Sequence, residues 1–291
     1  MVEELAIEQQ DIVQVCRVLK VSRSGYYGWR NRPASIRKTE DERLWLKIKQ
    51  HWEASRNAYG RIRITAKLQE DGEKIGKNRV SRIMSEHGIK GKGRKKFKPL
   101  TTDSNHNFPL AERLFQTENA TTQVRAVNQY WGGDITYIPT GEGWLYLSVV
   151  IDLFTKKVVG HAMRDHMRTE LISSALDLAI KRQGIVNGKN LIFHSDRGSQ
   201  YASDDYREKL KAFSIRPSMS RKGNCYDNAM VESFFRTLKV ELIYDQTYRT
   251  KEEAKAAIFE FIEVWYNRQR LHSSLDYTTP EQYEIEHSSA A

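Results

Sequence analysis

The sequence predicts an α+β protein in which an all-helical, basic region precedes a mixed β-sheet with flanking helices. Residues 144–151 form a continuous apolar run, which is typical of a strand buried on both faces. After residue 124, hairpin-sized strand segments are followed by alternating helices and strands, a pattern that favours a mixed sheet covered by helices. Before residue 90 the apolar periodicity is helical and is broken by turns.

Composition limits the class of protein. The chain has 291 residues and 39% apolar content, which predicts about two domains. No hydrophobic run approaches the length of a membrane span, and the N-terminus lacks the apolar segment of a signal peptide, so we expect a cytoplasmic protein. Cys16 and Cys225 are far apart and form no Cys-x-x-Cys pair, so the cysteines indicate neither a disulfide framework nor a zinc site.

The net charge of +10 is unevenly distributed. Residues 1–100 contain 24 Lys or Arg and 12 Asp or Glu, whereas residues 101–291 contain 23 and 25. A concentrated basic region attracts DNA phosphates through counterion release, although a solvated surface is the alternative. The predicted organisation is a basic helical region for DNA binding (1–98), a linker (99–123), a core with a C-terminal helix (124–285) and a tail (286–291).

Two helix pairs are predicted in the basic region. Residues 11–19 carry apolar side chains at helical spacing, and Ser22 is a suitable N-cap for a second short helix, so this pair is a helix-turn-helix candidate. Thr39 and Glu42 form a predicted capping box that would open a longer helix.

The second pair spans residues 62–68 and 78–86, with Gly88 at the C′ position of its last helix. Lys77, Arg79 and Arg82 are predicted to project from the outer face of that helix, as the side chains of a recognition helix in a major groove would. A purely structural helical bundle is the alternative.

A basic strap follows this pair at residues 90–98. It contains six basic residues in nine, and its glycines argue against a helix. We expect it to track DNA phosphates, with a plain solvated linker as the alternative. The candidate contacts within it are Lys90, Lys92, Arg94, Lys95 and Lys96.

The core is predicted to contain eight elements. In order they are strands at 130–138, 144–152 and 156–163, a helix at 167–182, a strand at 190–195, a helix at 203–212, a short strand at 214–218 and a helix around Glu232. The polar segment 217–224, which contains Arg221 and Lys222, is expected to be a mobile loop that becomes ordered when DNA and metal bind, with an ordinary exposed loop as the alternative.

Three carboxylates are the candidate catalytic and metal-binding residues. Asp134 lies in the first predicted strand, Asp196 follows the end of another, and Glu232 lies on a helix. Because converging carboxylates repel one another, they require hard divalent cations, and Mg²⁺ prefers carboxylate, water and phosphate oxygens. Two such ions would stabilise both the attacking and the leaving oxygen of a phosphodiester displacement.

Glu232 shares one helical face with Arg236 and Lys239, beside the apolar stripe that is predicted to pack on the sheet. The two basic residues could be ordinary helix charges that pair with Glu232, or they could contact DNA.

The carboxylate spacing resembles the aspartate-aspartate-glutamate pattern of retroviral integrases and related transposases. Asp196 and Glu232 are separated by 35 residues, and Lys239 follows Glu232 by seven. The phrases Trp131-Gly-Gly-Asp-Ile-Thr-Tyr137 and His194-Ser-Asp-Arg-Gly-Ser-Gln-Tyr201 are more specific, as is the segment 220–235. They resemble the second-reading-frame product of bacterial insertion sequences of the insertion-sequence-three family, over nearly the whole chain.

This resemblance implies an RNase H-like core and a transposase. The implied reaction is hydrolysis at the transposon ends in the presence of two Mg²⁺ or Mn²⁺ ions, followed by attack of the freed 3′-hydroxyl on target DNA. In the resembling family the lysine at the position of Lys239 contacts the transferred end.

The resemblance also implies the partners. They are double-stranded DNA, further copies of the chain on that DNA, and the upstream-frame product, fused or separate. No membrane partner is implied, and the implied location is the nucleoid. The alternative is a non-catalytic DNA-binding regulator that inhibits the fused enzyme.

Several residues near these phrases keep two interpretations. His194 could carry a proton or act as a ligand, but a histidine beside a strand-end carboxylate more often orients it or packs. Cys225 is more simply a packing residue than a nucleophile. The arginines and the histidine of the segment 266–272 could be structural caps or DNA contacts.

Overall fold

The computed structural model describes residues 12–33, 35–93, 111–114, 124–220 and 229–288. Six residues named above lie outside this part of the chain: Arg94, Lys95, Lys96, Arg221, Lys222 and Cys225.

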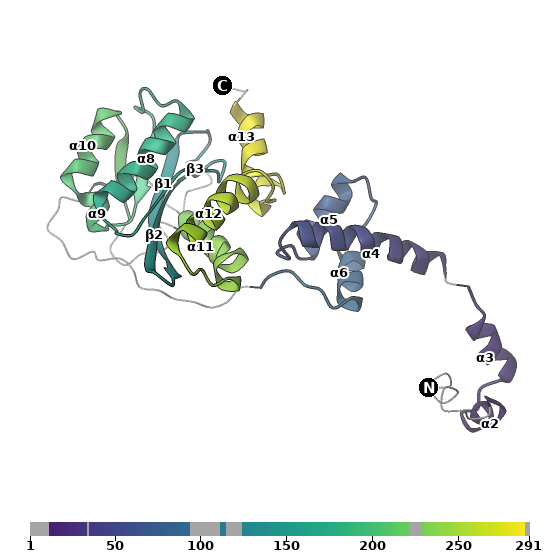
Figure 1. Ribbon diagram of the computed structural model, residues 1–291. Coiled ribbons are helices and arrows are strands. Elements are labelled where there is room, and N and C mark those ends of the chain that lie inside the picture. The colour runs from purple at the N-terminus through teal and green to yellow at the C-terminus, as the bar shows by residue number, and fades with distance from the viewer. Residues whose placement is uncertain (1–11, 34, 94–110, 115–123, 221–228, 289–291) are drawn as a thin grey trace.

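The described residues form a five-stranded sheet with the order β3-β2-β1-β4-β5 (Figure 1). Its strands are β1 (Tyr130–Thr140), β2 (Gly143–Asp152), β3 (Val158–Arg164), β4 (Ile192–Ser195) and β5 (Arg216–Met219). The first three strands pair antiparallel, whereas β4 pairs parallel to β1 and β5 pairs parallel to β4. The sheet is therefore mixed, as predicted.

Helices cover both faces of this sheet (Figure 1). Neighbouring residues of β2 point to opposite faces, so Val149 and Val150 belong to different apolar clusters. On one face lie α8 (Thr169–Gln183), α9 (Ser199–Ala202) and α10 (Asp204–Ala212). On the other lie α11 (Ala229–Glu241), α12 (Lys251–Glu260) and the π-helix η4 (Phe261–Tyr266). Two 3₁₀ turns, η3 (Ile243–Asp245) and η5 (Ser273–Leu275), and the last helix, α13 (Pro280–Ser288), complete this region.

The predicted elements of the core are all present, with ends that agree within three residues where the prediction gave them. Two details differ from the prediction. The short helix α9 was not foreseen, and residues 217–219 of the predicted loop belong to β5, because their backbone pairs with β4.

The N-terminal part consists of α2 (Ile12–Val18), α3 (Arg23–Arg30), α4 (Ile36–Ala54), α5 (Arg61–Glu70) and α6 (Lys77–Glu86). Ser22 caps α3 as predicted, by accepting a hydrogen bond from the Gly25 amide. The prediction that Thr39 opens α4 is wrong. Ser35 caps this helix through the Lys38 amide, and Thr39 lies inside it, where its hydroxyl donates back to the Ser35 carbonyl.

The three helices α4 to α6 share one continuous apolar cluster with α11, α12 and η4. The Tyr59 hydroxyl donates to the Gln269 carbonyl (3.3 Å) and accepts from the Leu271 amide (2.7 Å). The Arg63 Nε donates to the Leu271 carbonyl at 3.0 Å. The helical unit is therefore docked on the C-terminal part of the core.

A buried ion pair lies beneath this junction. The Arg270 guanidinium donates to both carboxylate oxygens of Glu241, with distances of 2.7–3.0 Å, and Trp265 Nε1 donates to the same carboxylate at 3.1 Å. The side chains of Arg270 and Glu241 are only 6% and 7% exposed. Because Glu241 ends α11, the pair connects the helix of Glu232 to the segment after η4.

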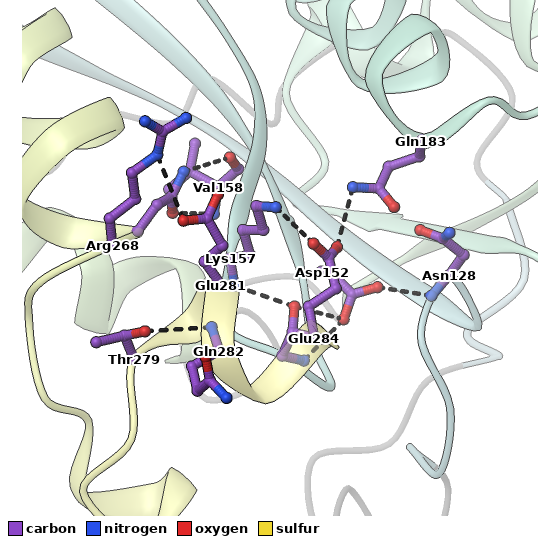
Figure 2. Close-up of polar contacts among 12 residues, drawn as sticks. Asn128, Asp152, Lys157, Val158, Gln183, Arg268, Thr279, Glu281, Gln282 and Glu284 are labelled. Atoms are coloured by element: carbon purple, nitrogen blue, oxygen red, sulfur yellow. Dashed lines mark hydrogen bonds and ion pairs between the residues drawn. The ribbon is translucent and has the colours of Figure 1, made fainter. Parts of the chain in front are cut away.

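The last helix is held against the edge of the sheet by polar contacts (Figure 2). The Glu284 carboxylate pairs with Lys157 and accepts a hydrogen bond from Gln183. Beside it, the buried Asp152 accepts from the amides of Asn128, Phe154 and Thr155, which shapes the turn between β2 and β3. None of the described helices is long and apolar enough to cross a membrane.

We expect Arg270→Ala to lower the free energy of unfolding by about 3–5 kcal/mol, because it leaves the Glu241 carboxylate buried without its partner. The double variant Glu241→Leu with Arg270→Met should recover most of this loss, since a buried ion pair can be replaced by apolar side chains of similar volume.

Urea unfolding measures these differences. The control is Lys255→Ala, which removes a solvent-exposed pair with Glu252 and should change stability little. A loss below about 1 kcal/mol in Arg270→Ala would show that the buried pair does not hold the junction together.

Candidate active site

The pairing of β1 with β4 places two predicted carboxylates side by side. Gly132 is opposite His194 in this parallel register. Asp134 and Asp196 each lie two residues beyond that pair, Asp134 still in β1 and Asp196 just past the end of β4. Neighbouring strands are about 4.8 Å apart, so the two backbones present these carboxylates from adjacent positions.

Two glycines allow this close approach. A Cβ on Gly133 would lie 2.4 Å from Cζ of Phe193 in β4, and a Cβ on Gly132 would lie 2.7 Å from Cγ2 of Val231 in α11. Side chains at these positions would force β4 and α11 away from β1. The Gly-Gly-Asp sequence is therefore required sterically, because it lets the strand carrying Asp134 contact the helix carrying Glu232.

Backbone amides orient both aspartates. The Gly198 amide donates to Asp196 Oδ1 at 2.9 Å, and a Cβ on Gly198 would lie 3.1 Å from that same oxygen. The Ile135 amide donates to Asp134 Oδ1 at 2.7 Å.

Electrostatics show that the three carboxylates share one neighbourhood. Burial raises the pKa of Asp134 well above its usual value, and the charges of Asp196 and Glu232 raise it further. Burial also raises the pKa of Glu232, which the Arg236 guanidinium partly offsets. Lys239 lies beside Asp134, and its burial lowers the pKa of its ammonium while Asp134 opposes that shift. The positive side chains therefore do not cancel the repulsion among the acids.

This donor set fits hard divalent cations. The carboxylates supply the oxygen ligands that Mg²⁺ and Mn²⁺ prefer, and the raised pKa of Asp134 marks a negative charge that a cation would stabilise. In the conformation described, no group of three His, Cys, Asp or Glu side chains within the described ranges is arranged to hold a metal ion.

His194 lies inside the sheet, away from solvent. It is buried, and its Nδ1 is 2.9 Å from the Ser218 hydroxyl of β5, which also accepts from the Leu114 amide. This geometry favours the packing interpretation of the histidine.

The structure also bears on the two interpretations of the basic residues in the segment after η4. Arg270 is the buried partner of Glu241, whereas Arg268 is on the surface near Glu281. Burial and nearby positive charges lower the pKa of His272 to about 3, so this imidazole is neutral at physiological pH. Because Arg270 is buried in its ion pair with Glu241, this arginine has a structural role.

The predicted DNA contacts of α6 differ in whether they already pair with acidic side chains. Lys77 is exposed at the start of the helix. Arg79 pairs with Glu40 and Asp41 at 2.8 Å, and Arg82 pairs with Asp41 at 2.6 Å and Glu86 at 2.7 Å. In the strap, Lys90 is exposed, whereas Lys92 pairs with Asp245 and donates to the Glu241 carbonyl.

The sequence prediction gave no role to Tyr201, although the residue lies in one of the quoted phrases. Its buried ring lies 6.1 Å from that of Phe193, and its pKa is raised by burial and by the charges of Asp134 and Asp196. Lys156 was also missed. Its ammonium lies 3.3 Å from Sδ of Met230, two residues before Glu232, and burial lowers its pKa to about 8.

Comparison with known families matches three segments of the chain. Residues 38–97 match an HTH-like domain, and residues 124–225 and 213–280 match two models of an integrase core domain. Among solved structures, a simian T-cell lymphotropic virus intasome in complex with a PP2A regulatory subunit covers 82% of this chain and 74% of its own, with 16% identity and a TM-score of 0.46. The HTLV-2 integrase catalytic core in complex with magnesium covers 55% and 97%, with 20% identity and a TM-score of 0.41.

Curated relatives match at higher identity. The Insertion element IS600 31 kDa protein of Shigella sonnei is 45% identical over 266 residues, which are 91% of this chain and 96% of the relative. The transposase InsF for insertion sequence IS3A of Escherichia coli (strain K12) is 39% identical over 281 residues, 94% and 93% of the two chains. With its HTH-like helices and its RNase H-like integrase core, the chain belongs to the IS3 family of insertion-sequence transposases.

Proposed function

We propose that Asp134, Asp196 and Glu232 hold two Mg²⁺ or Mn²⁺ ions, with which the chain cleaves DNA at the ends of its element and joins them to target DNA. The observation that carries this proposal is the position of Asp134 beside Asp196, each two residues beyond the last paired residues of the parallel strands β1 and β4, with the pKa of Asp134 raised by burial and by both other acids. Glu232 of α11, whose charge acts on Asp134, would supply the third carboxylate of the ligand set.

When bound, the ions stabilise the attacking and leaving oxygens of the displaced phosphodiester. In the first step a water oxygen bonds to phosphorus and the 3′-oxygen leaves. In the second step that 3′-oxygen bonds to a target phosphorus, and the 3′-oxygen of the target strand leaves. The three carboxylates fix the geometry, and neither step requires a nucleophile from the protein.

A regulator that only binds DNA is the alternative. Such a protein has no physical reason to bury one carboxylate beside another, since the repulsion between Asp134 and Asp196 destabilises the fold. We further propose that the chain acts on double-stranded DNA as a homo-oligomer, and that the upstream-frame product, fused or separate, assists it.

The DNA contacts of the helical unit are part of the same proposal. Lys77 and Lys90 are exposed and can meet phosphates directly. Arg79 and Arg82 would have to exchange Asp41 for DNA, so their contribution depends on breaking existing ion pairs.

Single changes of the three acids should abolish end cleavage and joining in Mg²⁺ while sparing DNA binding. We expect Asp134→Asn, Asp196→Asn and Glu232→Gln each to lower the rate at least roughly 100-fold, because each removes a charge that holds the reacting oxygens in place. Glu208→Gln, which changes an exposed acid of α10, is the matched control and should leave the rate unchanged.

Thermal unfolding with and without Mn²⁺ supplies a second readout. Asp134→Asn should be more stable than the unaltered chain without metal, because it relieves the repulsion, and it should lose the stabilisation that Mn²⁺ gives. Strand transfer that persists in any one of the three variants would remove that residue from the ligand set.

Lys239→Ala should mainly weaken engagement of the element end. The ammonium lies beside Asp134 and 5.5 Å from the Tyr137 ring centroid, where a point charge can contact a DNA phosphate without acting as a metal ligand. The DNA concentration needed for half-maximal rate should rise, with a smaller fall in the saturating rate. Metal affinity measured by titration should change little.

Lys255→Ala, a change of a partly exposed lysine on α12 that pairs with Glu252, is the control. A Lys239→Ala variant with the saturating rate of Glu232→Gln would assign Lys239 to the metal site. A variant that behaves like the unaltered chain would make the lysine a plain surface charge.

A further inference from the structure

A group of aromatic side chains lies next to Lys239 at the tip of the β1–β2 hairpin. We define the aromatic corner as Tyr137 and Trp144 of the hairpin together with Tyr244 of η3, whose pKa is raised by burial and by the nearby Tyr137. The rings of Tyr137 and Trp144 meet edge to face, with centroids 4.8 Å apart. Trp144 is 50% exposed and Tyr244 is 36% exposed. Large aromatic surface is therefore left open to solvent beside a cation.

The hairpin tip that carries Trp144 is fixed in place. The Gly141 amide donates to the Tyr248 carbonyl at 2.9 Å, and the Lys251 amide donates to the Glu142 carboxylate at 2.8 Å. A Cβ on Gly141 would lie 2.5 Å from the Arg249 carbonyl oxygen, so only glycine permits this contact. The exposed indole is consequently held by a rigid support, and little conformational entropy would be lost when a ligand stacks on it.

The corner is close to the carboxylates. Lys239 contacts the Tyr137 ring at 5.5 Å and also acts on Asp134. Tyr137 follows Asp134 by three residues in β1, which corresponds to about 10 Å along a strand. An odd offset sends the two side chains to opposite faces of the strand. The link between the corner and the carboxylates is therefore Lys239, which is near both Tyr137 and Asp134 at the edge of β1 beyond its pairing with β4, where a nucleotide next to the reacting phosphodiester can reach the rings.

A basic path leads to the same place. Tyr244 also lines a cavity of about 410 Å³ between the docked helical unit and the end of α11, together with Lys90 and Lys92. Lys92 pairs with Asp245, so the positive charges on the two sides of the corner are those of Lys239 and of the exposed Lys90, and they complement a phosphate backbone that carries its bases toward the rings.

From these observations we propose that the aromatic corner is a stacking site for an unpaired nucleobase of the DNA end, with Trp144 as its main surface. Every base has a π-face, so such a site accepts bases of any sequence. The site would retain the open end next to the carboxylates. This inference rests on the proposed function, because it assigns a specific part of the DNA substrate to the active site.

The test compares binding of two DNA probes to the full chain without metal. One probe is a blunt duplex, and the other has the same duplex with a short single-stranded tail. We expect a preference for the tailed duplex of roughly 5- to 100-fold, as stacking of a base on an aromatic side chain gives. Trp144→Ala should abolish this preference, and Trp144→Phe should retain most of it, because a smaller ring still stacks.

A third probe replaces the tail bases by abasic sites. The unaltered chain should bind this abasic probe as weakly as it binds the blunt duplex. The Trp144→Ala variant should bind the abasic probe and the intact tailed duplex equally. Phe259→Ala, which removes another exposed ring on α12, is the matched control and should keep the full preference.

Equal binding of tailed and blunt duplexes by the unaltered chain, or a full preference in Trp144→Ala, would overturn the stacking site. These measurements need no catalysis, so they separate this inference from the proposed reaction. A chain that shows the tail preference but no strand transfer would disprove the reaction alone.

Discussion

The ion pair between Glu241 and Arg270 holds together three parts of the chain that are distant in sequence. Glu241 ends the helix that carries Glu232, Arg270 follows the π-helix, and Tyr59 of the helical unit hydrogen-bonds to the backbone on either side of Arg270. Inside a protein a charge is stable only beside its partner, so loss of either side chain would disturb all three parts. The position of Glu232, which we propose as a catalytic carboxylate, thus depends on a contact at the far end of its helix.

In the candidate active site, by contrast, side chains of the same charge lie next to one another. The fold brings Asp134 next to Asp196 and leaves their repulsion only partly relieved by Lys239. Stability is lost there, and it is offset by the apolar cluster that is continuous between the helical unit and the core. Buried charges of the same sign lie together where we expect divalent cations to bind. Where the structure has only to be rigid, a buried charge has a partner of the opposite sign.

Much of this could be predicted from sequence because the signals are local. Strand character around Asp134 and the helical stripe beside Glu232 follow from residue periodicity, and the order of the phrases indicated the family. Long-range partners left no such signal. Nothing near Arg79 or Arg82 shows that Asp41, about forty residues earlier, takes their charges. The same is true of Glu241 and Arg270, and of the docking of Tyr59, because these contacts exist only after the chain has folded. The capping error at Thr39 has a local cause, since Ser35 competes for the same helix start.

The docking of the helical unit on the core would also set a fixed distance along DNA between the two proposed sites. If α6 lies in a DNA groove while the carboxylates hold a phosphodiester of the same duplex, the separation of the two sites is set by the protein. B-DNA turns once in about 10.5 base pairs, so a separation that is a few base pairs longer would also present the wrong side of the helix. The number of base pairs between the recognised segment and the cleaved bond is therefore constrained, even at positions where no base is read.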